Sequence, residues 1–187
     1  MLTIKRQKDN RVVKCIGARI ADIPGGVTVS VAELGGSGLF EGTPMGVGSD
    51  GLYHVCKTAQ VVSAATATAT AYEVAKGHHF KVGDYIAVET NKGQAITAID
   101  KSNSAKDIIT VGTTLGAKIV AGACAFQSDG SSTNLLVTPI GVAGNNEDVD
   151  AESNLFEPIW LIATVHATTA PIANDVIKAA LKGIVYY

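Results

Sequence analysis

The sequence predicts a mainly β protein. Most of its apolar segments show the period of two that is typical of strands with one buried face. The chain has 187 residues, and its 20 Gly residues suit a fold with many tight turns. Hydrophobic residues make up 47% and charged residues 17%, a balance opposite to that of disordered chains. A chain of this size can form one large domain or two small ones.

The expected strands follow one another along the chain, with turn residues between them. Val27–Val31 alternates cleanly, and Leu52–Cys56 alternates less well. Thr66–Tyr72 alternates a β-branched residue with a small one, which also favours a strand. The other expected strands are Asp84–Val88, Ala95–Ile99, Ile108–Val111, Leu135–Thr138 and Ile159–Val165.

One segment near the C-terminus has the signals of a helix instead. Pro171 is suited to a first helical turn, Asp175 lies early, and Gly183 lies just past the expected end. The apolar positions that would share one face of this helix are Ile172, Val176, Ile177, Ala180 and Leu181. Residues 184–187 then form a terminal strand or an apolar tail.

Two turn-rich stretches suggest how the chain is organised. They are Gly35–Gly38 and Ser128–Thr133. Between them, residues 60–127 hold a run of short strands that we expect to form an inserted small β-barrel. Residues 1–59 and 128–187 would then pair with each other as a discontinuous β domain, with residues 1–14 as an N-terminal arm.

Cysteine and histidine residues show no pattern typical of a metal site or a catalytic site. Cys15, Cys56 and Cys124 are far apart and form no C-x-x-C motif, so we expect reduced, mostly buried thiols. His78–His79 is interpreted as a pair of exposed loop residues. His54 and Cys56 could share one face of a strand as a nucleophile pair, but no motif supports this alternative.

The remaining motif candidates are also weak. Gly35–Gly38 lacks the Lys-Ser/Thr of a phosphate loop, so a turn is the better interpretation. The acidic segment Glu147–Glu152 lacks the spacing of a calcium loop and is expected to be a solvated turn. We therefore expect a protein without enzymatic activity, cofactor or metal.

Charge and hydropathy exclude several partners. The 15 Lys and Arg residues against 17 Asp and Glu residues give a net charge of −2, too balanced for a protein that mainly neutralises nucleic-acid phosphates. No apolar run of 18 residues occurs, so no membrane span is expected. The low charge content indicates either a surface covered by other chains or many small residues. Five basic residues gather in the arm: Lys5, Arg6, Lys8, Arg11 and Lys14.

Two stretches resemble known families. Gly77–Ile86 contains the pattern G-x-x-F-x-V-G-D-x-I, which resembles small β-barrel modules of phage structural proteins. In such modules Phe80 and Val82 would face the barrel interior, and Gly83–Asp84 would reverse the chain. The pattern I-T-V-x-x-x-L at Ile109–Leu115 follows, as it often does in these modules.

The second stretch resembles the C-terminal half of lambda-type head decoration proteins. It comprises Pro139–Ala143, the turn Glu147–Ala151, a hydrophobic strand and Ile177–Ile184, which is similar in outline to that family's closing L-x-x-x-G-I pattern. Upstream, Leu39–Pro44 is similar to a strand of that family. The resemblance covers roughly the outer 60% of the chain, and phage head fibre proteins show a similar combination.

The resemblance implies a virion structural protein that binds the outer capsid surface and stabilises the shell. Its fold would be a small β-barrel or β-tulip-like decoration domain with an inserted compact β-barrel and one C-terminal helix. The implied partners are the major capsid protein and further copies of the chain in a homotrimer, with no direct nucleic acid and no membrane. The implied location is the capsid surface of the virion, after synthesis in the bacterial host cytoplasm. In such proteins the arm reaches the capsid, so the candidate contacts are Leu2, Ile4, Lys5, Arg6, Lys8 and Arg11.

Two other functions stay open at this point. The chain could be a surface-binding module of a phage fibre or adhesin that recognises a glycan or host receptor. Aromatic residues make up only 5% of the chain, so platforms for stacking sugars are scarce. It could also be a self-processing domain or a Cys–His hydrolase, although a self-processing domain normally starts with Cys or Ser and this sequence starts with Met1.

Overall fold

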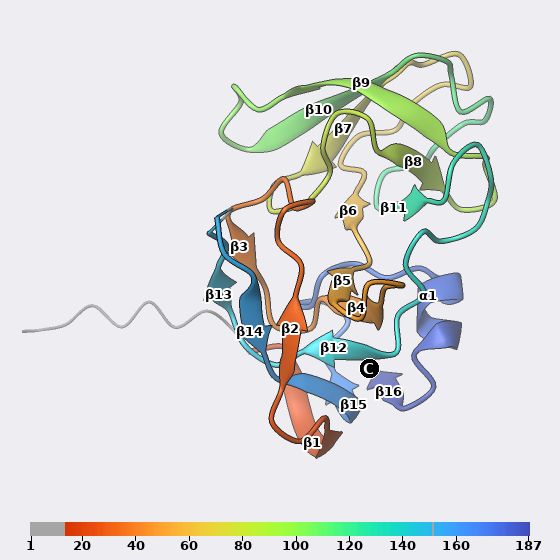
Figure 1. Ribbon diagram of the computed structural model, residues 1–187. Coiled ribbons are helices and arrows are strands. Elements are labelled where there is room, and N and C mark those ends of the chain that lie inside the picture. The colour runs from red at the N-terminus through yellow and green to blue at the C-terminus, as the bar shows by residue number, and fades with distance from the viewer. Residues whose placement is uncertain (1–13, 151) are drawn as a thin grey trace, which may run out of the picture.

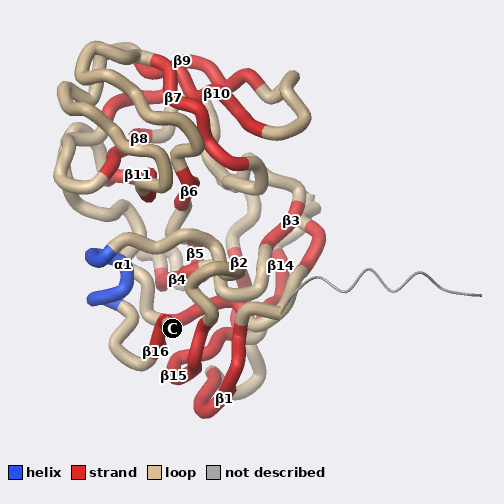
Figure 2. Tube along the Cα trace, turned by 180° about the vertical axis from the view of Figure 1, so that it is seen from behind, coloured by secondary structure: helices blue, strands red, loops and turns tan. Residues whose placement is uncertain are grey.

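The protein is mainly β, with a curled mixed half-barrel sheet, antiparallel sheets and one short C-terminal helix. The computed structural model describes residues 14–150 and 152–187, and this part of the chain contains sixteen strands and one helix (Figure 1). The six candidate contacts of the arm, from Leu2 to Arg11, lie outside the described residues. Two sheets therefore dominate the architecture, one at each end of the molecule (Figures 1 and 2).

The larger sheet has eight strands and is built from the two outer parts of the chain. Its pairings are antiparallel except that β16 runs parallel to β15 and β2 runs parallel to β5. The spatial order is β1 (Ile16–Asp22), β15 (Ile159–Val165), β12 (Gly141–Ala143), β4 (Pro44–Val47), β5 (Tyr53–Val55), β2 (Val27–Val29) and β14 (Leu155–Glu157), with β16 (Ile184–Tyr186) paired to β15.

The smaller sheet has six antiparallel strands from the middle of the chain. Its order is β6 (Thr58–Gln60), β11 (Cys124–Ser128), β8 (Tyr85–Val88), β9 (Gln94–Asp100), β10 (Lys106–Val111) and β7 (Ala71–Ala75). A bridge between Val61 and Val74 brings its first and last strands together. A third, two-stranded sheet pairs β3 (Gly38–Leu39) with β13 (Glu147–Asp148).

Alternation of side chains explains where the cores lie. In β10, Ile109 and Val111 are buried while Ile108 and Thr110 are only partly buried, as a strand with one buried face requires. Strand β11 differs, because all five of its residues are buried. Its Ala125 packs into the core of the six-stranded sheet, and its Phe126 packs into a second core with Ile177. The two sheets therefore share apolar packing across β11.

The C-terminal segment crosses over the larger sheet. The helix α1 (Asp175–Ala180) is preceded by Asn174, whose side chain accepts a hydrogen bond from the backbone of Ile177 and caps the first turn. The helix is shorter than the segment 171–182 expected from sequence, because the Asn174 side chain caps its start and the backbone N–H of Leu181 closes the last turn. Ile177 and Leu181 are buried, as expected, but Val176 is 53% exposed.

Several other expectations need correction. The segment 66–70 is an exposed turn rather than a strand, since its Thr and Ala side chains give neither face a large apolar group to bury. The expected strand Leu135–Thr138 is reduced to a single bridge between Leu135 and Ser128. By contrast, the expected strand Ile159–Val165 coincides with β15.

Three lysine side chains join the two sheets around the turn 32–35. The ammonium groups of Lys57, Lys81 and Lys101 donate hydrogen bonds to the carbonyl oxygens of Glu33, Ala32 and Gly35, at 2.7, 2.7 and 2.8 Å. Lys57 is 1% exposed and also contacts the Asp84 carboxylate at 2.8 Å. A buried ammonium is tolerated only where it is paired and hydrogen-bonded, and Lys57 meets both conditions.

Replacing Lys57 should therefore destabilise the fold. We expect Lys57→Met to lower the free energy of unfolding by about 3 kcal/mol, because Asp84 would lose its cation and the Glu33 carbonyl its donor. Urea unfolding followed by far-ultraviolet circular dichroism measures the change. The exposed Lys92 gives the matched control, and Lys92→Met should stay within about 0.5 kcal/mol of the parent protein. Equal stability of both variants would contradict a structural role for the Lys57 ammonium.

Candidate functional site

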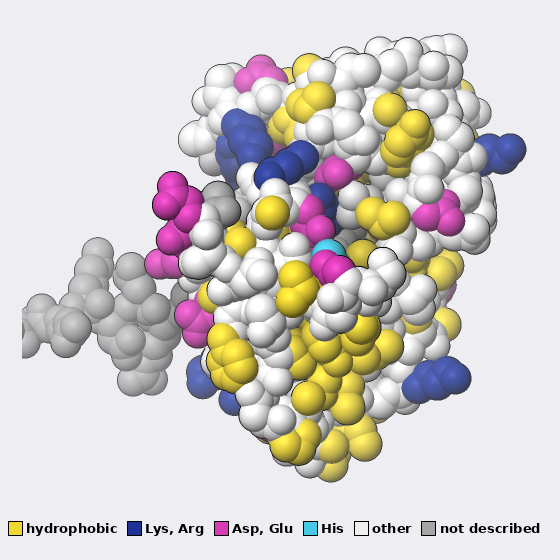
Figure 3. All heavy atoms as spheres, in the orientation of Figure 1, with side chains coloured by type: hydrophobic (Ala, Val, Ile, Leu, Met, Phe, Trp, Pro, Cys, Tyr) yellow, Lys and Arg dark blue, Asp and Glu magenta, His cyan; other side chains and the backbone are white. Residues whose placement is uncertain are grey.

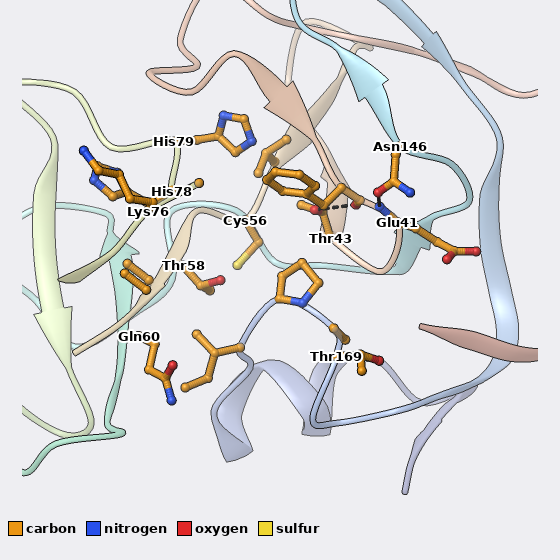
Figure 4. A pocket seen from close by; sticks show the side chains of 18 of the residues that line it. Glu41, Thr43, Cys56, Thr58, Gln60, Lys76, His78, His79, Asn146 and Thr169 are labelled. Carbon is orange, nitrogen blue, oxygen red and sulfur yellow. Dashed lines mark hydrogen bonds between the residues drawn. The ribbon is translucent and has the colours of Figure 1, made fainter. Parts of the chain in front are cut away.

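The candidate site is a cavity of about 570 Å³ at the junction of the two sheets (Figure 4). Five stretches of the chain, which lie far apart in sequence, supply its walls. Its lining residues fall within 40–43, 55–60, 75–79 and 167–172, with Asn146 from the turn before β13. A volume of this size suits a small organic ligand or a short segment of a larger one.

Two glycines determine the wall that carries His78 and His79. A Cβ atom on Gly35 would lie 2.2 Å from the Phe80 carbonyl oxygen, and one on Gly36 would lie 2.9 Å from that of His78. Only glycine allows the turn to approach the backbone of residues 78–80 this closely. The backbone N–H of Gly35 donates to the carbonyl of His79 at 2.9 Å. This contact buries the two histidines, so their prediction as exposed loop residues is wrong.

His78 belongs to a buried network of charged groups. Its Nε2 atom lies 3.2 Å from an oxygen of the Asp107 carboxylate, which is itself buried. Lys76 contacts the same carboxylate at 2.5 Å and donates a further hydrogen bond to the Lys101 carbonyl. Burial lowers the pKa of His78, although the negative charge of Asp107 opposes the shift.

His79 lies in the wall, where a backbone group of Gly38 is the one weak polar contact of its ring within the described chain. Only 4% of the residue is exposed, and within the described chain neither ring nitrogen forms a hydrogen bond. Burial lowers its pKa to about 4, and the positive charges of Lys57 and His78 add to this shift. The imidazole is therefore neutral near neutral pH and offers one donor and one acceptor.

The charged side chains of the cavity wall are paired with other charged groups of the protein. The Glu41 carboxylate pairs with Arg19 and accepts a hydrogen bond from the backbone of Cys15 at 2.9 Å. Figure 4 shows the Glu41 side chain pointing away from the cavity. Lys76 is occupied by Asp107, as described above. Within the described residues, the wall therefore presents mainly uncharged polar and apolar groups.

The geometry does not fit the alternative of a Cys56–His54 nucleophile pair. The nitrogens of His54 contact Glu33 at 2.7 Å and Asp50 at 3.0 Å, so neither is left to take a proton from a thiol. Burial lowers the pKa of His54, but the two carboxylates outweigh it and raise the pKa overall. Burial raises the pKa of Cys56 to about 12, which keeps its thiol protonated.

The other cysteines and the remaining sequence candidates take varied places. All three cysteines are free and buried, as expected. Phe80 is fully buried in the core of the six-stranded sheet, which confirms that part of its prediction, but Val82 is 62% exposed. In the segment Glu147–Glu152, Glu147 and Asp148 are exposed but form β13 rather than a turn.

No sequence pattern predicts the residues that complete the cavity. Phe40, Gln60 and Asn146 carry no recognisable motif, and only folding brings them together. The adjacent pairs Gly35–Gly36 and His78–His79 are the available signal, since paired glycines permit close backbone packing. In the described ranges, no three His, Cys, Asp or Glu side chains are grouped as ligands for one metal ion.

Comparison of the chain with protein-family models, with curated proteins and with solved structures gives no match. Among the described residues, no helix has the length and apolar character needed to span a membrane. Functional inference therefore depends on the fold, the surface and the cavity.

Titration of His79 should make the protein less stable in acid. In the unfolded chain a histidine takes up its proton near pH 6.5, whereas His79 in the folded protein does so only near pH 4. Stability is therefore lost as the pH falls from about 6.5 to 4, by an amount on the order of 3 kcal/mol. We expect His79→Phe to remove this part of the pH dependence in urea unfolding measured across that range. His166 is exposed and provides the control variant, His166→Phe. An unchanged pH dependence in His79→Phe, or an equal change in His166→Phe, would contradict the assignment to His79.

Proposed function

We propose that the chain is a non-enzymatic structural protein of a phage virion, which binds the outer capsid surface as a head decoration or head fibre protein. The observation that carries the proposal is that the segments with the family resemblance are neighbours in one sheet. Residues 141–143 form β12, and β12 pairs with β4, the strand that begins at Pro44 of the upstream segment. The hydrophobic strand is β15, and the closing pattern leads into β16, which pairs with β15.

The division of the chain supports the same proposal. All six strands of the smaller sheet lie between Thr58 and Ser128, and all strands of the larger sheet lie outside that range. We propose that residues 60–127 are an inserted small β-barrel, because the bridge from Val61 to Val74 joins the sheet's two outer strands. Residues 1–59 and 128–187 would then be the capsid-binding domain, with a barrel- or tulip-like form.

An exposed apolar surface on the larger sheet supports binding to another protein. Figure 3 shows hydrophobic side chains gathered over β4, β12 and β15. Among the exposed large hydrophobic residues of these strands are Val47 of β4 and Ile162 of β15, which are 52% and 44% exposed. Contiguous apolar surfaces of this kind mark interaction sites on soluble proteins. We propose that this surface contacts the major capsid protein or further copies of the chain in a homotrimer.

The proposed function places the chain on the virion, where its presence can be measured. The chain would be made in the cytoplasm of a bacterial host and carried on the virion surface, without direct contact with nucleic acid or membrane. Particles from an induced lysogen that encodes the chain can be banded on a density gradient and analysed by quantitative mass spectrometry. Recovery at many copies per particle supports the proposal. Absence of the chain from particles that contain the capsid protein would refute it.

The apolar surface gives a variant test on the same particles. We expect Ile162→Lys to reduce the number of copies per particle, because it places an ammonium group within the surface that the capsid would bury. Val120 is comparably exposed but lies outside the larger sheet, before β11, so Val120→Lys is the matched control and should bind normally. Mass spectrometry of purified particles gives both values. Similar loss in both variants, or in neither, would exclude the surface over β15 as the contact.

The arm can be tested separately. Deletion of residues 1–13, which include Leu2, Ile4, Lys5, Arg6, Lys8 and Arg11, should greatly reduce particle binding if the arm contacts the capsid. The melting temperature should stay close to that of the full chain, because the three apolar cores of the described chain contain residues from Cys15 onward. Binding is measured by sedimentation of added protein with particles that lack it. Full binding of the shortened chain would remove the arm from the proposed interface.

A further inference from the structure

A separate inference, which goes beyond capsid binding, concerns the cavity at the sheet junction. Its wall contains polar groups that the fold itself does not use. The Thr58 hydroxyl, the Gln60 amide and the Nδ2 atom of Asn146 form no hydrogen bond within the described chain, although Oδ1 of Asn146 accepts one from the backbone N–H of Glu41 at 2.9 Å. These groups supply both donors and acceptors.

His79 adds a buried polar group to the same wall. An unpartnered buried donor or acceptor is uncommon in folded proteins, because it loses its hydrogen bonds to water. Both nitrogens of His79 are in this state among the described residues, and the residue is 96% removed from solvent, since 4% is exposed. A ligand or an ordered water in the cavity would satisfy them. The neutral imidazole and the neighbouring amides favour a ligand that can both donate and accept.

The charges around the cavity restrict the ligand further. The cation of Lys76 is held by Asp107 at 2.5 Å, and the carboxylate of Glu41 is held by Arg19 and the backbone of Cys15. In residues 14–150 and 152–187, the wall therefore has no uncommitted charge to pair with a phosphate, a carboxylate or an ammonium group. An ion that entered would lose hydration without gaining a partner, so the cavity favours an uncharged ligand.

An aromatic ring completes the wall. Phe40 is 41% exposed and lies against Gly77, where a Cβ atom would be 3.0 Å from the ring. Gly77 has a positive φ of 85°, so both its backbone conformation and the nearness of the ring favour glycine there. A phenyl ring has two flat apolar faces. The C–H face of a pyranose ring can pack on such a surface while its hydroxyl groups reach polar partners.

We infer that this cavity binds an uncharged saccharide, of one or two sugar units. Hydroxyl groups match walls that mix donors and acceptors, the Phe40 ring provides the packing surface, and the volume of about 570 Å³ accommodates a ligand of that size. The sugar can be a free disaccharide or a unit of a surface glycan, and both present the same chemistry.

The full chain can be titrated with maltose, cellobiose, lactose and diacetylchitobiose while amide correlation spectra are recorded. Saturable shifts confined to residues 58–60, 75–79 and 146 with at least one disaccharide would support the inference. Retention of the protein on the corresponding immobilised polysaccharide would identify a glycan as the source. Amide shifts with the free disaccharide, without retention of the protein on the polysaccharide, would identify the disaccharide as the source. If no saccharide shifts these amides, or if only inorganic phosphate or N-acetyl-trialanine amide does, the inference is overturned.

Matched variants connect the binding to the named groups. Thr58→Val removes one hydroxyl with little change in shape, and we expect it to weaken sugar binding about three- to tenfold. Thr28 is exposed on β2 of the other sheet, so Thr28→Val should leave the affinity unchanged. Phe40→Ala provides a second test that does not depend on the buried histidine, and it should also weaken binding. Equal affinity in Thr58→Val, Phe40→Ala and the parent chain would place the sugar elsewhere and refute the site.

Discussion

The structure depends on how the turn 32–35 is held between the two sheets. Its carbonyl groups face the six-stranded sheet and accept hydrogen bonds from Lys57, Lys81 and Lys101. Backbone carbonyls that leave water need partners, and three ammonium groups provide them at one place. Gly35 makes the contact possible, because any side chain there would collide with the Phe80 carbonyl. Apolar packing of Phe126 and Ile177 then extends the junction on its other side.

This way of joining the sheets also creates the cavity. The polar contacts at the turn and the apolar contacts at β11 hold two separate regions of the junction, and the cavity lies beside them. Its walls therefore contain residues from both regions. The buried histidines come from the region of polar contacts, and Cys56 and Ile172 come from the region of apolar contacts. A junction with uniform apolar packing would leave no unpartnered group such as the ring of His79. Burial keeps the thiol of Cys56, which lines the cavity, protonated.

The sequence predicts local features of this fold better than its distant contacts. The apolar run Ile159–Val165 predicts β15 correctly, because a buried strand needs only its own residues to be recognised. The pattern around Phe80 likewise predicts a core residue. Burial of His78 and His79 could not be predicted in this way, because it is caused by Gly35 and Gly36, more than forty positions earlier in the printed sequence. The cavity combines five separate stretches, and their proximity depends on strand pairings that local patterns do not encode.

The pairing of β1 with β15 and of β15 with β16 has a consequence for synthesis of the chain. The six-stranded sheet has all of its strands once Ser128 has been made, and its contacts are comparatively close in sequence. The eight-stranded sheet cannot gain β15 and β16 until residues 159–186 have emerged. It must then pair β15 with β1, which is made near the beginning, and β16 with β15. Sheets with such distant pairings form slowly. During translation the early strands β1, β2, β4 and β5 therefore form without the later strands of their sheet. Unpaired strand edges promote aggregation, so the chain is most exposed to aggregation in this interval.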